Sequence, residues 1–243
     1  MDSKDNISKE NTSDNELNNI KKQSKEINST KANIHQKNKE VTKFDTVSID
    51  HKIIVTDEKY LSNKHIILRL KPSTMNKSKF VVLDHHKKEL FNCIIHSSKP
   101  IQNSISDSKG NVIINFDVDL KIHSKTSKLY IYTETDDVNK QKITFNSRNS
   151  MKAIKYTVEF ASKSGKEEML DVIYDKSKII HIYYGKMKEG GSLICKADTH
   201  SLFKNSSKIE IAPGIDIIFM MTVVFTISQL IQSMDELNYL VLI

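Results

Sequence analysis

Short apolar runs alternate with polar clusters along most of the chain after residue 50. The runs are rich in Ile, Val, Phe and Tyr, and each is bounded by Asn, Asp, Gly, Lys or Ser. This pattern is typical of β-strands joined by turns, and its regular repetition favours antiparallel strands in a sandwich or barrel. About twelve strands are expected, at HKIIVTD (51–57), HIILRL (65–70), KFVVLD (79–84), LFNCIIH (90–96), NVIINFDVD (111–119), KLYIYTE (128–134), QKITF (141–145), AIKYTVEFA (153–161), MLDVIYD (169–175), KIIHIYYG (178–185), SLICKAD (192–198) and KIEIA (208–212).

Two segments repeat the order strand, aspartate, polar turn, strand. They are FVVLDHHKKELFNCII around Asp84 and IQNSISDSKGNVIINF around Asp107. Aspartate side chains in such turns accept hydrogen bonds from the backbone, and glycine supplies positive φ angles. We interpret the similarity as repeated hairpins and not as a solenoid.

The stretch Ile215–Ile231 is the one long segment with helical character, and we expect a central helix over about 214–232. Pro213 and Gly214 end the preceding strand, and Asp216 places an acceptor and a negative charge in the first turn. The polar residues form one narrow stripe and every other face is apolar, so the helix must be buried in lipid or in protein. The stripe consists of Thr222, Thr226, Gln229 and Ser233.

Helix length and strand count decide between these two environments. The helical stretch would span about 25 Å, slightly less than the hydrocarbon core of a bilayer. A closed barrel of about eleven or more strands has a lumen wide enough for one helix. The expected fold is therefore mainly β, an antiparallel barrel of about twelve strands enclosing a hydrophobic C-terminal α-helix. The alternative is a helix that anchors the chain in a membrane.

Residues 1–45 have no aromatic side chain before Phe44 and consist largely of Lys, Asn, Ser, Glu and Asp. Such a segment cannot bury enough apolar area to offset its chain entropy, which predicts a disordered extension before a domain at 46–243. Leu17, Ile20, Ile27 and Ile34 have heptad-like spacing, so a short coiled coil is the alternative.

Composition limits the cellular setting. No N-terminal signal peptide is apparent, and Cys93 and Cys195 stand alone, which favours an intracellular, reducing compartment. The net charge of +7 comes almost entirely from lysine, because Arg69 and Arg148 are the only arginines. A lysine-rich composition reflects either genome bias or attraction to an anionic membrane, and nucleic acid is not an expected partner.

The segment KIEIAPGIDIIFMMTVVFTISQL resembles the end of the tubby-like C-terminal superfamily, especially its LURP-one-related and phospholipid scramblase branches. Pro213, Gly214 and Asp216 carry the likeness, together with the upstream YYGKMKEGGSLICKAD. The resemblance covers about residues 50–240. It implies a twelve-stranded barrel threaded by its own C-terminal helix.

Two groups of residues are candidates for function. Tubby-like relatives bind phosphoinositide head groups through exterior lysine and arginine, and ammonium groups suit phosphate chemically. The candidate head-group ligands here are Lys64, Arg69, Lys71, Lys77, Lys79, Lys186, Lys188 and Lys196. Asp117 and Asp119 share one face of a strand and form a weak Ca²⁺ candidate, which the calcium response of scramblase-like relatives also suggests.

No nucleophile elbow, P-loop or dinucleotide fingerprint is present, so we expect a protein that is not an enzyme. The lone cysteines and the lack of an apparent signal peptide lead us to expect a cytoplasmic location. We expect peripheral binding to anionic or phosphoinositide-containing membranes, without a cofactor. One alternative is a scramblase-like protein whose C-terminal helix lies in the bilayer as a tail anchor. Another is a protein-interaction scaffold that uses the N-terminal extension.

Overall fold

The computed structural model describes residues 52–74, 76, 78–96, 103–119, 124–133, 140–148, 153–198 and 207–240, with side chains up to Met234 in the last range. The expected N-terminal extension at 1–45, its coiled-coil alternative and Lys77 lie outside the described residues. Those expectations therefore remain predictions.

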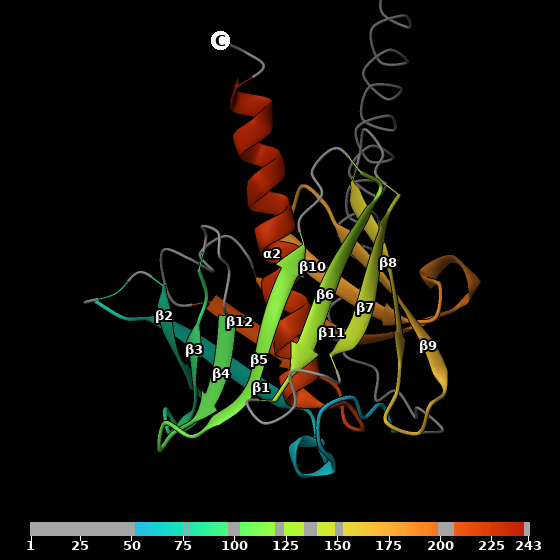
Figure 1. Ribbon diagram of the computed structural model, residues 1–243. Helices are drawn as coiled ribbons and strands as arrows, with labels where there is room; N and C mark the ends of the chain where they lie inside the picture. Colours follow the sequence, from blue (N-terminus) through green and yellow to red (C-terminus); the bar gives the residue numbers. More distant parts are fainter. Residues whose placement is uncertain are drawn as a thin grey trace, which may run out of the picture. The chain divides into compact units, whose positions relative to one another are not determined.

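Twelve antiparallel strands close into a barrel, in which each strand pairs with its neighbours in sequence and β1 pairs with β12 (Figure 1). This confirms the expected fold class. The strands are β1 (Ile66–Pro72), β2 (Lys79–Leu83), β3 (Glu89–Ile94), β4 (Asn103–Asp107), β5 (Val112–Asp119), β6 (Thr126–Tyr132), β7 (Gln141–Ser147), β8 (Ile154–Ala161), β9 (Glu167–Tyr174), β10 (Ile179–Tyr184), β11 (Ser192–Asp198) and β12 (Ser207–Ile211).

Alternation along each strand separates a buried inner face from a polar outer face. In β1, Leu68 and Leu70 are fully buried, whereas Arg69 and Lys71 are exposed. Successive side chains of a strand point to opposite faces, so this pattern directs every second residue into the lumen. The inner residues of all twelve strands form one apolar lining.

Helix α2 (Ile217–Leu240) fills the lumen and continues beyond the strands at the top of Figure 1. Every residue from Ile218 to Ile231 is buried. Phe219 stacks at a tilt on Phe160 with ring centroids 4.7 Å apart, and Phe225 packs on Phe80 at 6.5 Å. Because a lumen lined by apolar side chains would otherwise be empty, the helix serves as the core of the barrel.

The polar stripe of α2 is satisfied mostly within the helix itself. Thr222 Oγ1 donates to the Ile218 carbonyl at 2.8 Å, and Thr226 Oγ1 donates to the Thr222 carbonyl at 2.9 Å. Ser233 does the same toward Gln229 at 2.9 Å. Hydroxyls that bond to a carbonyl one turn earlier lose little on burial, which explains how these polar residues lie inside the barrel.

The expected helix bounds of 214–232 are wrong at both ends. Asp216 is the capping residue before the helix and does not lie in its first turn: its Oδ1 accepts the Phe219 N–H at 3.0 Å, and its carbonyl accepts the Met220 N–H at 3.0 Å. At the other end the helix continues past Ile231 to Leu240. Residues 232–240 contain neither Pro nor Gly, so nothing stops the helix where its apolar run ends.

Two corrections concern the expected strands. The described part of the first expected strand, 52–57, is not a strand, although Ile53 forms an isolated bridge with Ile215. It belongs to a segment that we call the strap, residues 52–62, which includes the 3-10 helix η2 (Glu58–Tyr60). The barrel strand missing from the list of twelve runs is β4, which the repeated hairpin around Asp107 had indicated; its polar sequence NSISD places only Asn103 and Ile105 on the inner face.

The strap crosses the end of the barrel where α2 begins, which we call the base. The Ile53 N–H donates to the Gly214 carbonyl at 2.9 Å, and the Gly214 N–H donates to the Ser62 carbonyl at 2.7 Å. Gly214 has a φ of 82°, a value that side chains disfavour. Pro213, Gly214 and Asp216, singled out from the sequence, therefore build the turn that joins β12, the strap and α2.

Candidate functional site

Four cationic residues lie together on the outer surface of three neighbouring strands. We call them the basic face: Arg69 and Lys71 of β1, Lys79 of β2 and Lys208 of β12. Arg69 is directly opposite Lys208 in the β1–β12 register. Lys71 is opposite Val81, and Lys79 lies two residues from Val81 on the same face. All four side chains are exposed.

Positive charge on the basic face exceeds the acidic charge beside it. The Lys208 Nζ lies 2.7 Å from Glu210 Oε1, and His65 Nε2 lies 3.6 Å from the other oxygen of the same carboxylate. Within the described residues, none of Arg69, Lys71 and Lys79 forms an ion pair. Like charges opposite each other on adjacent strands are destabilising, so this arrangement favours an anionic partner.

The other candidate lysines lie at different places. Lys64 is exposed just before β1, close in sequence to the basic face. Lys196 is half-buried on β11, where it is opposite Glu210 on one side and His181 on the other. Burial lowers the pKa of His181, and the Lys196 charge acts in the same direction. Lys196 thus extends the basic face only at its edge.

Lys186 and Lys188 belong to a separate surface at the 3-10 helix η3 (Met187–Glu189). The Met187 N–H donates to Asp171 Oδ2 at 3.0 Å, and Arg148 pairs with the other oxygen of that buried carboxylate. This holds η3 against β9, three strands away from β12 in the barrel order. The structure therefore divides the sequence candidates into two groups.

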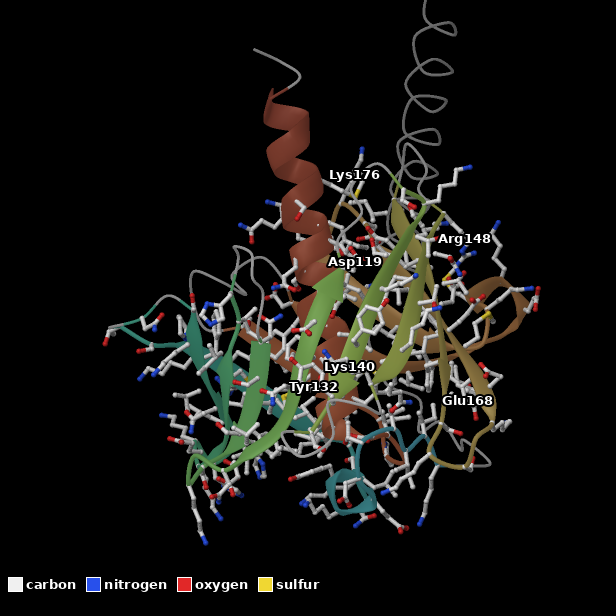
Figure 2. The ribbon with its side chains drawn as sticks, in the orientation of Figure 1. Asp119, Tyr132, Lys140, Arg148, Glu168 and Lys176 are labelled. Atoms are coloured by element: carbon white, nitrogen blue, oxygen red, sulfur yellow. The ribbon has the colours of Figure 1, made fainter. Side chains whose placement is uncertain are left out.

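Asp117 and Asp119 lie on the outer face of β5, as the alternation predicts, and both are half-buried. The Tyr132 hydroxyl donates to Asp117 Oδ1 at 3.2 Å, and Lys140 Nζ lies 3.6 Å from Oδ2. Figure 2 shows Tyr132 and Lys140 together, toward the base, with Asp119 further along the barrel. No group of three or more His, Cys, Asp or Glu residues in the described part of the chain is placed to hold a metal. The Ca²⁺ site remains a prediction.

Both cysteines are buried and chemically quiet. Cys93 and Cys195 are unpaired, and burial raises the pKa of each thiol well above its usual range. A thiol that stays protonated is a poor nucleophile and a poor metal ligand. Neither cysteine contributes to the candidate site.

Comparison with known proteins gives the family. The model of the LURP-one-related family matches residues 64–228, which run from Lys64, just before β1, to the middle of α2. The chain belongs to the LURP-one-related family. This confirms the resemblance inferred from Pro213, Gly214 and Asp216.

The structural comparison finds an X-ray structure of a protein from Arabidopsis thaliana. The two share 14% sequence identity with a TM-score of 0.45, over 76% of this chain and 98% of the other. No curated protein matches the sequence.

Lys208 is the member of the basic face that the sequence candidates lacked. The alternation in SKIEI indicates that Lys208 and Glu210 share the outer surface. Lys208 lies opposite Arg69 because β1 pairs with β12 where the barrel closes, and these two strands are far apart in sequence. Local patterns carry no information on that register.

Proposed function

We propose that this protein is a non-enzymatic LURP-one-related domain that binds anionic phospholipid surfaces, including phosphoinositides, through the basic face. The observation that carries the proposal is the placement of Arg69 opposite Lys208 while Lys71 and Lys79 lie beside them without a described acidic partner. Each lysine or arginine near an anionic leaflet contributes about 1 kcal/mol to binding.

Geometry supports a peripheral contact. The four cations are carried by three neighbouring strands, so their backbones are fixed relative to one another, and long side chains adapt to the head groups. A guanidinium at Arg69 can engage a phosphate with two parallel hydrogen bonds, whereas the lysines act as point charges.

A vesicle sedimentation assay on the full chain tests the proposal. We expect weak binding to phosphatidylcholine vesicles and stronger binding when phosphatidylserine or a phosphatidylinositol bisphosphate is added. The variant Arg69→Glu, Lys71→Glu, Lys79→Glu should lose at least about 3 kcal/mol, roughly 100-fold or more in affinity. High salt should weaken binding, because it screens charge attraction.

The matched control reverses three other exposed lysines, Lys142→Glu, Lys163→Glu and Lys176→Glu, which changes the net charge equally. Equal losses in the two triple variants would show that net charge, and not the basic face, drives binding. Insensitivity to lipid charge and salt would contradict the proposal altogether.

The scramblase-like alternative would place α2 in the bilayer. Ile217–Met234 is long and apolar enough to cross a membrane, but 78% of that window is buried inside the protein. Because moving α2 into lipid would empty the lumen, we favour the peripheral mode. A carbonate wash of isolated membranes separates the two, since it releases a peripheral protein and leaves an anchored one.

A further inference from the structure

A cavity of about 390 Å³ lies at the base of the barrel, between the strap and the strands β4 to β7. One wall comes from the strap, with Val55 and Tyr60, and the other comes from β5 and β6, with Ile114 and Ile131. Ligand pockets are typically about 300–1,000 Å³, lined mostly by apolar side chains with a few polar groups, and barrel mouths are a frequent place for them. The volume and position therefore suit a small molecule.

Two tyrosine rings in the cavity wall already hold ammonium groups. Lys59 Nζ lies 5.0 Å from the centroid of the Tyr60 ring, and Lys140 Nζ lies 4.3 Å from the centroid of the Tyr132 ring. Both distances are within the range of cation–π attraction. Figure 2 shows Tyr132 and Lys140 close together near the base. The wall thus has the chemistry that recognises an organic cation.

Among the described carboxylates that line the cavity, Asp107 forms no ion pair, although the charge of Lys109 in its own turn also lowers its pKa. Lys59 Nζ lies 3.6 Å from Asp57 Oδ2, and Lys140 is paired with Asp117. Asp107 is bonded only to neutral donors: its Oδ1 accepts the Lys109 and Asn111 N–H groups at 2.8 and 2.9 Å, and its Oδ2 accepts Asn111 Nδ2 at 2.8 Å. A cation entering the cavity would neutralise it.

Two observations support an ionised Asp107 that faces the aromatic wall. The side-chain hydrogen bond from Asn111 lowers the pKa of Asp107, so the carboxylate is charged at neutral pH. Tyr60 and Asp107 both line the cavity, and burial raises the pKa of Tyr60 although the Lys59 charge opposes that change. Val112, 38% exposed, provides an apolar entrance beside them.

We propose that the base cavity binds a small amphipathic cation, an amine or quaternary ammonium on a compact apolar body, with the ammonium between Tyr60 and Asp107. The apolar body rests on Ile114 and Ile131. This site is separate from the basic face. Strands β3 and β4 lie between β5 and the nearest strand of the basic face, β2. Its ligand is opposite in charge to the phospholipid of the proposed function.

Phenethylamine, protonated at neutral pH, serves as the probe, and phenethyl alcohol and phenylacetate serve as neutral and anionic analogues of similar shape. Titration calorimetry on the full chain should give saturable phenethylamine binding, with both analogues at least about tenfold weaker. Equal binding of the alcohol, or no saturable binding of the amine, would overturn the proposal.

Variants locate the binding. Asp107→Asn should weaken phenethylamine binding about tenfold, because it removes the charge and keeps the acceptor oxygen of the turn. The control is Asp84→Asn: Asp84 accepts the His86 and Lys88 N–H groups at 2.8 and 2.9 Å in an equivalent turn that does not line the cavity. Val112→Lys changes an already exposed position and should abolish binding without unfolding the barrel. Wild-type affinity in Val112→Lys and Asp107→Asn, or an equal loss in Asp84→Asn, would contradict the site.

Discussion

The two ends of helix α2 differ in how completely their polar groups are hydrogen-bonded. At the base of the barrel, both carboxylate oxygens of Asp216 accept hydrogen bonds. Further along the lumen, one polar atom of the helix has no partner among the described residues. Asp216 Oδ2 accepts the Val55 and Thr56 N–H groups at 3.1 and 2.6 Å, and the Thr56 hydroxyl also donates to it at 2.8 Å. At the far end, Gln229 Nε2 donates to the His96 carbonyl at 2.9 Å, but Gln229 Oε1 has no partner within the described residues.

The strands around the far end also leave polar groups unpaired. Asn103 Oδ1 accepts the His96 N–H at 2.8 Å, but Asn103 Nδ2 and Ser207 Oγ are buried without a partner in the described part of the chain. Buried polar groups left unpaired cost free energy, whereas paired ones fix position. The comparison teaches that directional bonds position α2 at the base, while apolar packing holds it elsewhere.

Deleting residues 213–243 removes both ends and should have the largest effect. Ten buried apolar side chains in the described part of α2 would be lost, at roughly 1.5–3 kcal/mol each, which exceeds a usual net stability of about 5–15 kcal/mol. We expect the 1–212 fragment to aggregate, measured as loss of soluble monomer. A soluble fragment that melts cooperatively would show that the lumen does not need its helix.

A milder form of the same test is Val224→Asp, which buries an unpaired carboxylate midway between the two ends. We expect the domain to unfold, as seen by circular dichroism. Val224→Ile serves as the control, because adding one methylene to a packed core typically costs about 1–3 kcal/mol.

The variant Asp216→Asn changes only the hydrogen bonds at the base of the barrel. The amide keeps the volume of the carboxyl group but replaces one acceptor oxygen with an NH₂ donor that faces other N–H groups, which should destabilise the fold by about 3 kcal/mol. Urea unfolding measures this loss, with the turn variant Asp84→Asn as a control that should stay within about 0.5 kcal/mol. A loss no larger than the control's would mean that the strap contributes little to holding α2.

The pH dependence of stability tests whether the Asp216 carboxyl group accounts for the stability loss at the base. Burial raises the pKa of its carboxyl group, while hydrogen bonds from Phe219, Thr56 and Val55 oppose that change. With a raised folded-state pKa, the contribution to stability is complete below the unfolded value of about 3.9 and declines as pH rises through the folded value.

The stability advantage of the wild type over Asp216→Asn should therefore narrow between acidic and neutral pH. The narrowing amounts to about 1.4 kcal/mol for every pH unit that separates the folded pKa of Asp216 from its unfolded pKa. Urea unfolding of both proteins across that pH range measures it. An advantage that grows with pH would mean that the folded pKa is lowered, and that the hydrogen bonds outweigh burial.

Gln229→Leu tests the far end and should have the smallest effect. The change removes an unpaired buried oxygen but leaves the His96 carbonyl without its donor, so the two contributions oppose each other. We expect the unfolding free energy to change by less than about 1 kcal/mol. A loss as large as that of Asp216→Asn would abolish the distinction between the two ends.

Eleven of the twelve strands could be predicted from runs such as KIIHIYYG, because alternation and β-branched residues are local signals. The exception, β4, has a single large apolar residue, Ile105, so only the repeated hairpin around Asp107 indicated it; it is a strand because β3 and β5 pair with it on both sides. The HKIIVTD segment has the local pattern of a strand, but the carboxylate of Asp216 takes the N–H groups of Val55 and Thr56. No local pattern in the strap reveals that distant partner.

The candidate sites divide in the same way. Arg69 and Lys71 were predictable as neighbours because they alternate on one strand, whereas Lys208 joins them only through the register of the barrel closure. The base cavity was not predicted, because Tyr60, Asp107 and Tyr132 come from three separate segments. Turn chemistry identified Asp107 as a hairpin residue but carried no information on what faces it.

The pairing of β1 with β12 also has a consequence for biosynthesis. Since α2 follows all twelve strands in the sequence, a ribosome exposes every lumen-facing side chain before it delivers the segment that covers them. Contacts between such distant parts of a chain form late and slowly, and incompletely closed sheets aggregate readily. We therefore expect the nascent chain to stay an unclosed sheet during synthesis, and chaperone demand to fall abruptly once α2 has emerged.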